Sequence, residues 1–167
     1  MAELRILMTR RADGGSVLRC ERVDGSVTWQ RLDGPQAAFF PLHDLTHYAV
    51  ETVLGARDGF FGLIAEGWDV ADTTGKGARG RLPHATVAIE RIVGLLDVER
   101  GSGAAWSAED FNDQMRLATS SAGVEQQFRP VTEEELSRIR TRRRELFGEW
   151  AQLQPDETLE LVFQRPP

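Results

Sequence analysis

Hydrophobic and polar residues alternate along the first thirty or so residues, as they do in β-strands that bury one face. Strands are predicted over residues 4–9, 16–23 and 26–32. The Asp24-Gly25 pair between the second and third strands predicts a two-residue hairpin, because both central positions of a type I′ turn need positive φ. The N-terminal part is therefore predicted to form an antiparallel meander.

From residue 41 to about residue 149 the apolar positions recur at helical spacing, and no strand is predicted there. Pro41 suits the first turn of a helix and Gly55 suits its end. Four more helices are expected, over residues 58–65, 84–98, 107–119 and 132–152. The last two begin with capping boxes, Ser107 with Asp110 and Thr132 with Glu135. A polar Gly/Thr-rich loop is expected over residues 69–83.

Alternation returns at residues 158–163, where Leu159, Leu161 and Phe163 share one face. A lone strand is not stable alone, so it is expected to pair with the N-terminal meander. The predicted fold class is α+β: an antiparallel sheet made of the N-terminal β-meander and the C-terminal strand, packed against about five helices. At 167 residues, the chain is expected to form one domain, 1–167.

Composition narrows the classes of function. The formal net charge of −6 argues against broad attraction to nucleic acid or to anionic membranes. The basic run at 138–144 is flanked on both sides by glutamates, which indicates a solvated, salt-bridged face. A single cysteine, Cys20, excludes an intramolecular disulfide and a cysteine-rich zinc site. No run approaches the roughly 18 apolar residues of a membrane span, and no signal peptide is recognisable, so a cytoplasmic protein is expected.

Two of the three histidines, His43 and His47, lie four residues apart in the predicted helix that begins at Pro41. Residues four apart are neighbours on a helix, so both imidazoles can point at one atom. The helical projection places them with Glu51 beside the apolar face, and Asp44 away from them. Two imidazoles and a carboxylate are typical ligands of zinc, so the sequence predicts a divalent-metal site, with zinc as the first choice.

The sequence leaves three candidates for the third ligand. Glu51 lies one turn further along the same helix, Glu66 lies near the end of the next helix, and His84 begins the helix after the polar loop. Antiparallel packing of helices can bring either of the last two beside His43 and His47.

The pattern His43-Asp44-x-x-His47 with a later Glu66 resembles the motif of the zincin metallopeptidases, His-Glu-x-x-His with a downstream glutamate. The resemblance covers five residues and one spacing. It implies that His43, His47 and Glu66 bind the metal and that Asp44 is the general base. Aspartate is one methylene shorter than the glutamate of that family, which retracts the carboxylate by about 1.5 Å.

Two functions follow from these patterns. The first is a small cytoplasmic metal-dependent hydrolase that acts on a small molecule or a peptide. The alternative is a non-catalytic binding or assembly domain, with a structural role for the histidine helix. Lys76, Arg79 and Arg81 would cover an anionic ligand if their loop folds over that helix. The edges of a short sheet make a homodimer plausible, and neither nucleic acid nor membrane is expected as a partner.

Overall fold

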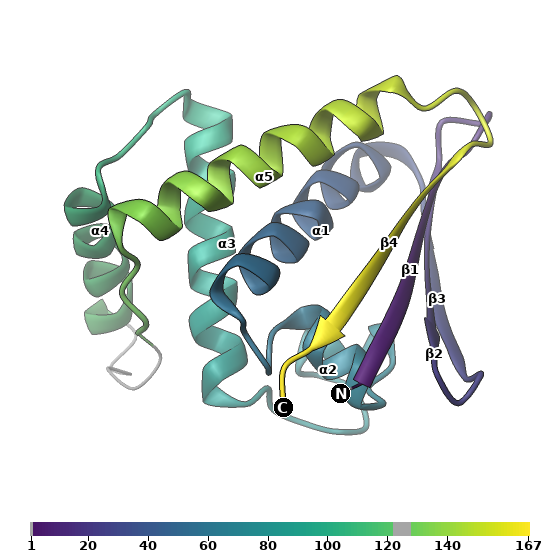
Figure 1. Ribbon diagram of the computed structural model, residues 1–167, viewed down its shortest axis with the longest axis horizontal. Coiled ribbons are helices and arrows are strands. Elements are labelled where there is room, and N and C mark those ends of the chain that lie inside the picture. Colours follow the sequence, from purple (N-terminus) through teal and green to yellow (C-terminus); the bar gives the residue numbers. More distant parts are fainter. Residues whose placement is uncertain (1, 122–127) are drawn as a thin grey trace.

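The computed structural model of the chain describes residues 2–121 and 128–167 (Figure 1). Its elements follow one another in two groups, three strands first and then helices, before the chain returns to the sheet. In chain order they are β1 (Ala2–Arg10), β2 (Ser16–Arg22), β3 (Val27–Leu32), α1 (Gly34–Leu54), α2 (Phe60–Glu66), the 3-10 helix η1 (Val70–Thr74), α3 (His84–Ser102), α4 (Ala108–Ser121), α5 (Glu133–Gln152) and β4 (Thr158–Arg165).

The four strands form one antiparallel sheet in the order β3-β2-β1-β4. The C-terminal strand pairs with β1 along its whole length, with Leu161 opposite Ile6. Both the α+β class and the return of the last strand to the meander are thus confirmed. The inner face is buried because apolar side chains alternate along each strand. The buried residues of this face include Leu4, Ile6, Met8, Leu18, Cys20, Leu159, Leu161 and Phe163.

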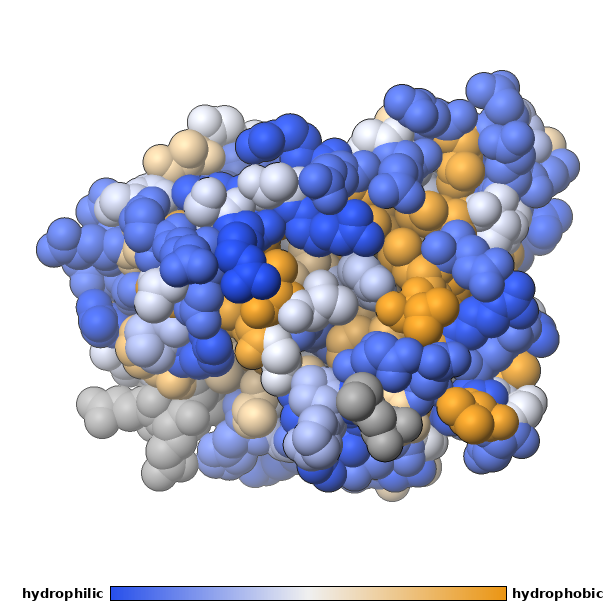
Figure 2. All heavy atoms as spheres, viewed as in Figure 1, coloured by the Kyte–Doolittle hydropathy of each residue, from blue (hydrophilic) through white to orange (hydrophobic). Residues whose placement is uncertain are grey.

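Helices cover one face of the sheet, and a second helical layer lies beyond them (Figure 1). The first core cluster joins the inner sheet face to α1, α2 and the end of α5. The second joins α1 to α3, α4 and α5, so α1 is packed on both sides. In the view of Figure 2, hydrophilic side chains predominate over α4 and α5, while apolar side chains reach the surface over β1 and β4.

Helix α1 begins at Gly34, seven residues before the predicted start, so the prediction that Pro41 opens the helix is wrong. Pro35 occupies the first turn, where its missing N–H costs nothing. Pro41 lies inside the helix and is buried. The extra turns matter because they carry Gln36 and Phe40, both of which line the cavity described below. The predicted end at Gly55 is confirmed by its left-handed φ of 60°.

One detail of the sheet also differs from the predictions. The hairpin lies at Asp24-Gly25, but only Gly25 has positive φ (84°), so the turn is not type I′. Instead the Asp24 carboxylate accepts hydrogen bonds from the backbone N–H and the hydroxyl of Ser26. Trp29 lies on the outer face of the sheet with 62% of its surface exposed. The capping box of α5 is present as predicted. At α4 the Ser107 hydroxyl accepts from the Asp110 N–H as predicted, but the Asp110 carboxylate accepts from that hydroxyl and not from the Ser107 backbone N–H.

The thiol of Cys20 is fully buried on the inner face of the sheet. Burial raises its pKa to about 12, and the nearby charge of Asp44 adds to the increase. Because the thiolate is the reactive form, we expect the native protein at pH 8 to react with a thiol reagent at least ~100-fold more slowly than the unfolded chain. The rates with a chromogenic disulfide, measured with and without denaturant, check this expectation. Equal rates would show that Cys20 is accessible.

Candidate metal site

A cavity of about 470 Å³ opens where α1 meets the edge strand β3, the segment around η1 and the first half of α3. Its wall combines polar and apolar side chains. The lining residues are Gln30, Leu32, Gln36, Phe40, His43, Asp44, His47, Phe60, Val70, Thr73, Thr74, Leu82 and Glu90. The histidine helix therefore faces a space large enough to admit a small molecule.

Three potential ligands converge on this cavity. His43 and His47 come from α1 and Glu90 comes from α3. One nitrogen of each histidine and one carboxylate oxygen of Glu90 all lie within 4.8 Å of one another. A cation placed among them can contact all three at once. The structure thus brings together the two histidines that the sequence predicted, with a carboxylate that it did not.

Each histidine is oriented through its Nδ1 atom by a second carboxylate. His43 Nδ1 lies 2.6 Å from Asp97 Oδ2, and His47 Nδ1 lies 3.2 Å from Glu51 Oε1. Metal-binding histidines usually have such a partner, which fixes the ring and leaves Nε2 for the metal. His47 Nε2 is buried and, within the described part of the chain, makes no hydrogen bond of acceptable geometry, although Glu90 Oε1 lies 3.2 Å away.

The two carboxylates next to His47 favour a positive charge at this position even without a metal. Burial alone would lower the pKa of His47, but Glu90 and Glu51 outweigh it and raise the pKa to about 10. Conversely, burial would raise the pKa of Glu90, and the positive charge of His47 lowers it below its usual value. Without a metal, a protonated His47 therefore stands between two carboxylates. A divalent cation can take the place of that proton.

Glu51, one of the predicted ligands, is fully committed to contacts within the protein. Its Oε1 accepts from the Phe61 N–H in addition to contacting His47, and its Oε2 accepts from the Gly62 N–H. It thereby caps the N-terminus of α2 from another helix, where a carboxylate is favoured. A Cβ added at Gly59 would lie 2.2 Å from the Glu51 carboxyl carbon, so this approach requires glycine. Glu51 positions His47 rather than facing the cavity.

Asp44, the predicted base, lies in the cavity wall and is only 4% exposed. Burial raises its pKa to about 7, against the opposing charges of His43 and His47. Within residues 2–121 and 128–167, no group hydrogen-bonds its carboxylate. About 100° of helical rotation separates Asp44 from His43 and about 60° separates it from His47, and all three residues line the same cavity.

The other two predicted ligands lie elsewhere. Glu66, at the end of α2, pairs with Arg165 at 3.3 Å, and about half of its side chain is exposed. His84 is the exposed first residue of α3. Neither belongs to the group formed by His43, His47 and Glu90. The downstream glutamate on which the zincin resemblance depends is therefore not beside the histidines in this structure.

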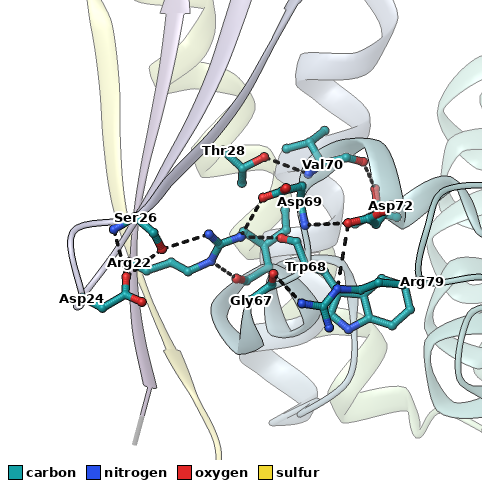
Figure 3. A network of polar contacts seen from close by, with 12 residues as sticks. Arg22, Asp24, Ser26, Thr28, Gly67, Trp68, Asp69, Val70, Asp72 and Arg79 are labelled. Carbon is teal, nitrogen blue, oxygen red and sulfur yellow. Dashed lines mark hydrogen bonds and ion pairs between the residues drawn. The ribbon is translucent and has the colours of Figure 1, made fainter.

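The segment that follows α2 packs against β3 and α2, and two arginines bind the backbone at its start (Figure 3). Arg22 of β2 donates to the carbonyl oxygens of Ile64 (2.6 Å) and Trp68 (2.5 Å). Arg79 donates to Gly67 O at 2.9 Å and stacks over the Trp68 ring. The segment contributes Val70, Thr73, Thr74 and Leu82 to the cavity, whereas Lys76, Arg79 and Arg81 do not line it.

Glu90 was missed because it comes from a different helix, and only tertiary packing reveals which face of α3 meets α1. One signal was present. Glu90 and Asp97 are seven residues apart, about two helical turns, so they share one side of a mostly apolar helix. They meet His47 and His43 respectively, which shows that α1 and α3 run antiparallel at the site. Two acidic residues seven apart on one helix can therefore face two histidines four apart on an antiparallel helix, and this pattern can be recognised in a sequence.

Comparison with known proteins identifies no relative: no family model, no curated protein and no solved structure matches the chain. The functional argument therefore depends on the geometry alone. In residues 2–121 and 128–167, helices that are both long and apolar enough to cross a membrane are absent.

Proposed function

We propose that this chain is a metal-dependent hydrolase whose divalent cation, zinc as the first choice, is bound by His43, His47 and Glu90. One observation carries the proposal. Two histidines and a glutamate converge within 4.8 Å, and each histidine has a carboxylate at Nδ1. Two histidines with one glutamate is a ligand set of catalytic zinc sites, which keep an open coordination position.

The cavity supports catalysis more than a purely structural metal. Structural zinc sites are closed by four protein ligands, whereas this group offers three and faces about 470 Å³ of open space. A zinc ion held there would act as a Lewis acid on a substrate carbonyl and would make water a better nucleophile at neutral pH. Asp97 and Glu51 would hold the two imidazoles in place.

Asp44 is the proposed general base. It shares the cavity with the three ligands, and its carboxylate is not engaged by any described hydrogen-bond donor. A base must come within hydrogen-bond reach of the proton that it takes, directly or through one water. A carboxylate in the wall of the cavity, beside the ligands yet outside their group, meets that condition better than Glu51, whose oxygens are both occupied.

The composition of the wall favours an uncharged substrate. No lysine or arginine is among the lining residues, and Asp44 and Glu90 contribute negative charge. An anionic group would therefore find no cationic side chain to bind it, apart from the metal. The amides Gln30 and Gln36 can hydrogen-bond a neutral polar group, while Phe40 and Phe60 supply apolar contact. A small amide or ester with an apolar substituent fits this wall.

The test measures hydrolysis of neutral amides and esters, each beside an analogue that carries an added carboxylate. We expect activity that a chelator removes and zinc restores, with the neutral member of each pair preferred. Asp44→Asn is expected to lower the rate by about 10²–10⁴-fold with zinc still bound. Asp113→Asn, a similar change at an exposed position of α4, is the control. Activity that is unaffected by both the chelator and Asp44→Asn would contradict the proposal.

The alternative is a non-catalytic domain in which the same residues form a structural ion cluster. The observation in its favour is that a carboxylate oxygen lies 3.2 Å from each imidazole nitrogen of His47, from Glu51 on one side and from Glu90 on the other, so the ions can pair without a metal. Under this alternative, zinc would bind weakly or not at all. Equilibrium zinc binding therefore separates the two functions before any substrate is found.

A further inference from the structure

A second hollow, of about 310 Å³, lies where the end of α3 and the following segment meet the middle of α5. Four arginines line it: Arg100, Arg140, Arg143 and Arg144. Glu99 is the only acidic residue among its lining residues. Four guanidinium groups against one carboxylate leave a local charge of +3 in a chain whose formal net charge is −6. None of these residues lines the cavity of the metal site.

Glu99 cannot neutralise this group, because its carboxylate is already occupied. It is 3% exposed, and it accepts from Nε and Nη2 of Arg140 and from the Trp106 N–H. Arg143 comes no closer than 4.0 Å to it and uses Nη1 to donate to the Leu96 carbonyl. With Glu99 paired to Arg140, Arg143 stays 4.0 Å from that carboxylate, and among the described residues Arg100 pairs only with Asp97, at 3.6 Å.

Some guanidinium groups of the arginine hollow keep N–H donors that no described residue accepts. Arg100 Nε is buried and, within the described residues, has no hydrogen-bond acceptor. Its Nη2 is 3.6 Å from Asp97, whose other oxygen bonds His43. Arg144 is exposed, and nothing in residues 2–121 and 128–167 pairs with it. The pKa of Arg143 lies below its usual value, through burial and through the charges of Arg140 and Arg100, opposed by Glu99 and Asp97.

We propose that this arginine hollow binds the phosphate or carboxylate group of a small anionic molecule. Guanidinium groups present paired donors that match the oxygens of both groups, and several of them in a concave, partly buried place bind more tightly than one on a flat surface. A nucleic-acid backbone fits less well, because the chain as a whole is acidic and would repel a long polyanion outside the hollow. The proposal does not depend on the metal site.

The test uses the metal-free full chain with a chelator present, so that an anion on a bound metal cannot be mistaken for this site. Inorganic phosphate and citrate are titrated by calorimetry, with chloride at matched ionic strength as the control. We expect saturable binding of at least one of the two at a stoichiometry of one. Tighter binding of phosphate would assign the ligand to phosphorylated molecules, and tighter binding of citrate to carboxylates.

Arg144→Gln and Arg100→Gln are each expected to weaken that binding by about tenfold or more, because each removes charged donors from the hollow. Arg138→Gln is the matched control, since Arg138 is exposed on the same helix and lines a different surface hollow. Arg144 is exposed, so its substitution leaves the fold intact. Absence of saturable binding, or an equal loss in Arg138→Gln, would overturn the proposal. So would retention on nucleic acid without binding of either small anion.

Discussion

Substituting His47 by alanine is expected to weaken zinc binding by more than ~100-fold, because even the loss of a residue that only orients a ligand costs about 10–100-fold. Glu90→Gln is expected to have a comparable effect. It removes the charge while keeping the shape of a side chain that is one-third exposed, so the fold should persist. Competition with a chromogenic zinc chelator, on protein purified without a histidine tag, measures both affinities.

The controls for this experiment are the two predicted ligands that lie outside the group, Glu66 and His84. Glu66→Ala and His84→Ala should leave zinc affinity unchanged, since Glu66 pairs with Arg165 and His84 is exposed at the start of α3. A large loss in Glu66→Ala, with none in Glu90→Gln, would show that the metal uses the ligand set implied by the zincin resemblance. A large loss in His84→Ala, with none in Glu90→Gln, would show that His84 is the third ligand.

Glu51→Ala is expected to lower the free energy of unfolding by about 3–5 kcal/mol, because it removes one partner of a buried charged cluster. The N–H groups of Phe61 and Gly62 would lose their acceptor, and His47 would keep only Glu90. Glu51→Gln retains one carbonyl oxygen and should cost less. Urea unfolding followed by circular dichroism measures the free energy of unfolding of the unsubstituted protein, of Glu51→Ala and of Glu51→Gln.

Glu66→Ala is the reference for this series, because Glu66 is a glutamate of the adjacent helix with an exposed ion pair. Such pairs contribute about 0–1 kcal/mol. If Glu51→Ala is no more destabilised than Glu66→Ala, then the contacts of Glu51 with α2 and His47 do not stabilise the fold. Its role in positioning His47 would then have to be abandoned.

The sheet could be predicted from the sequence because one of its faces is buried and the other is not. Leu159, Leu161 and Phe163 alternate with exposed residues, and this pattern predicted a strand that joins the N-terminal meander. That the strand pairs with β1 is known only from the structure. Local side-chain chemistry also predicted the start of α5, where Thr132 and Glu135 bond each other's backbone N–H groups. The predicted start of α1 was wrong because a proline in the first turn of a helix and a proline inside a packed helix look alike in sequence.

Only the part of the candidate site that lies on a single helix could be predicted from the sequence. The i, i+4 spacing of His43 and His47 follows from helical geometry, and the structure joins both to one group. The third member, Glu90, depends on how α3 packs against α1, which no local pattern determines. His47 was predicted beside the apolar face of the helix, and in the structure it is buried, with 1% of its surface exposed, because α3 covers that side of α1.

The central claim is that His43, His47 and Glu90 hold one divalent metal ion. A crystal of the untagged protein soaked in zinc, with anomalous differences measured on both sides of the zinc absorption edge, tests this claim most directly. We predict one strong peak between the two imidazoles and the Glu90 carboxylate, with coordination distances near 2.0–2.2 Å. A map with no peak there, or with its only peak beside His84, would contradict the account.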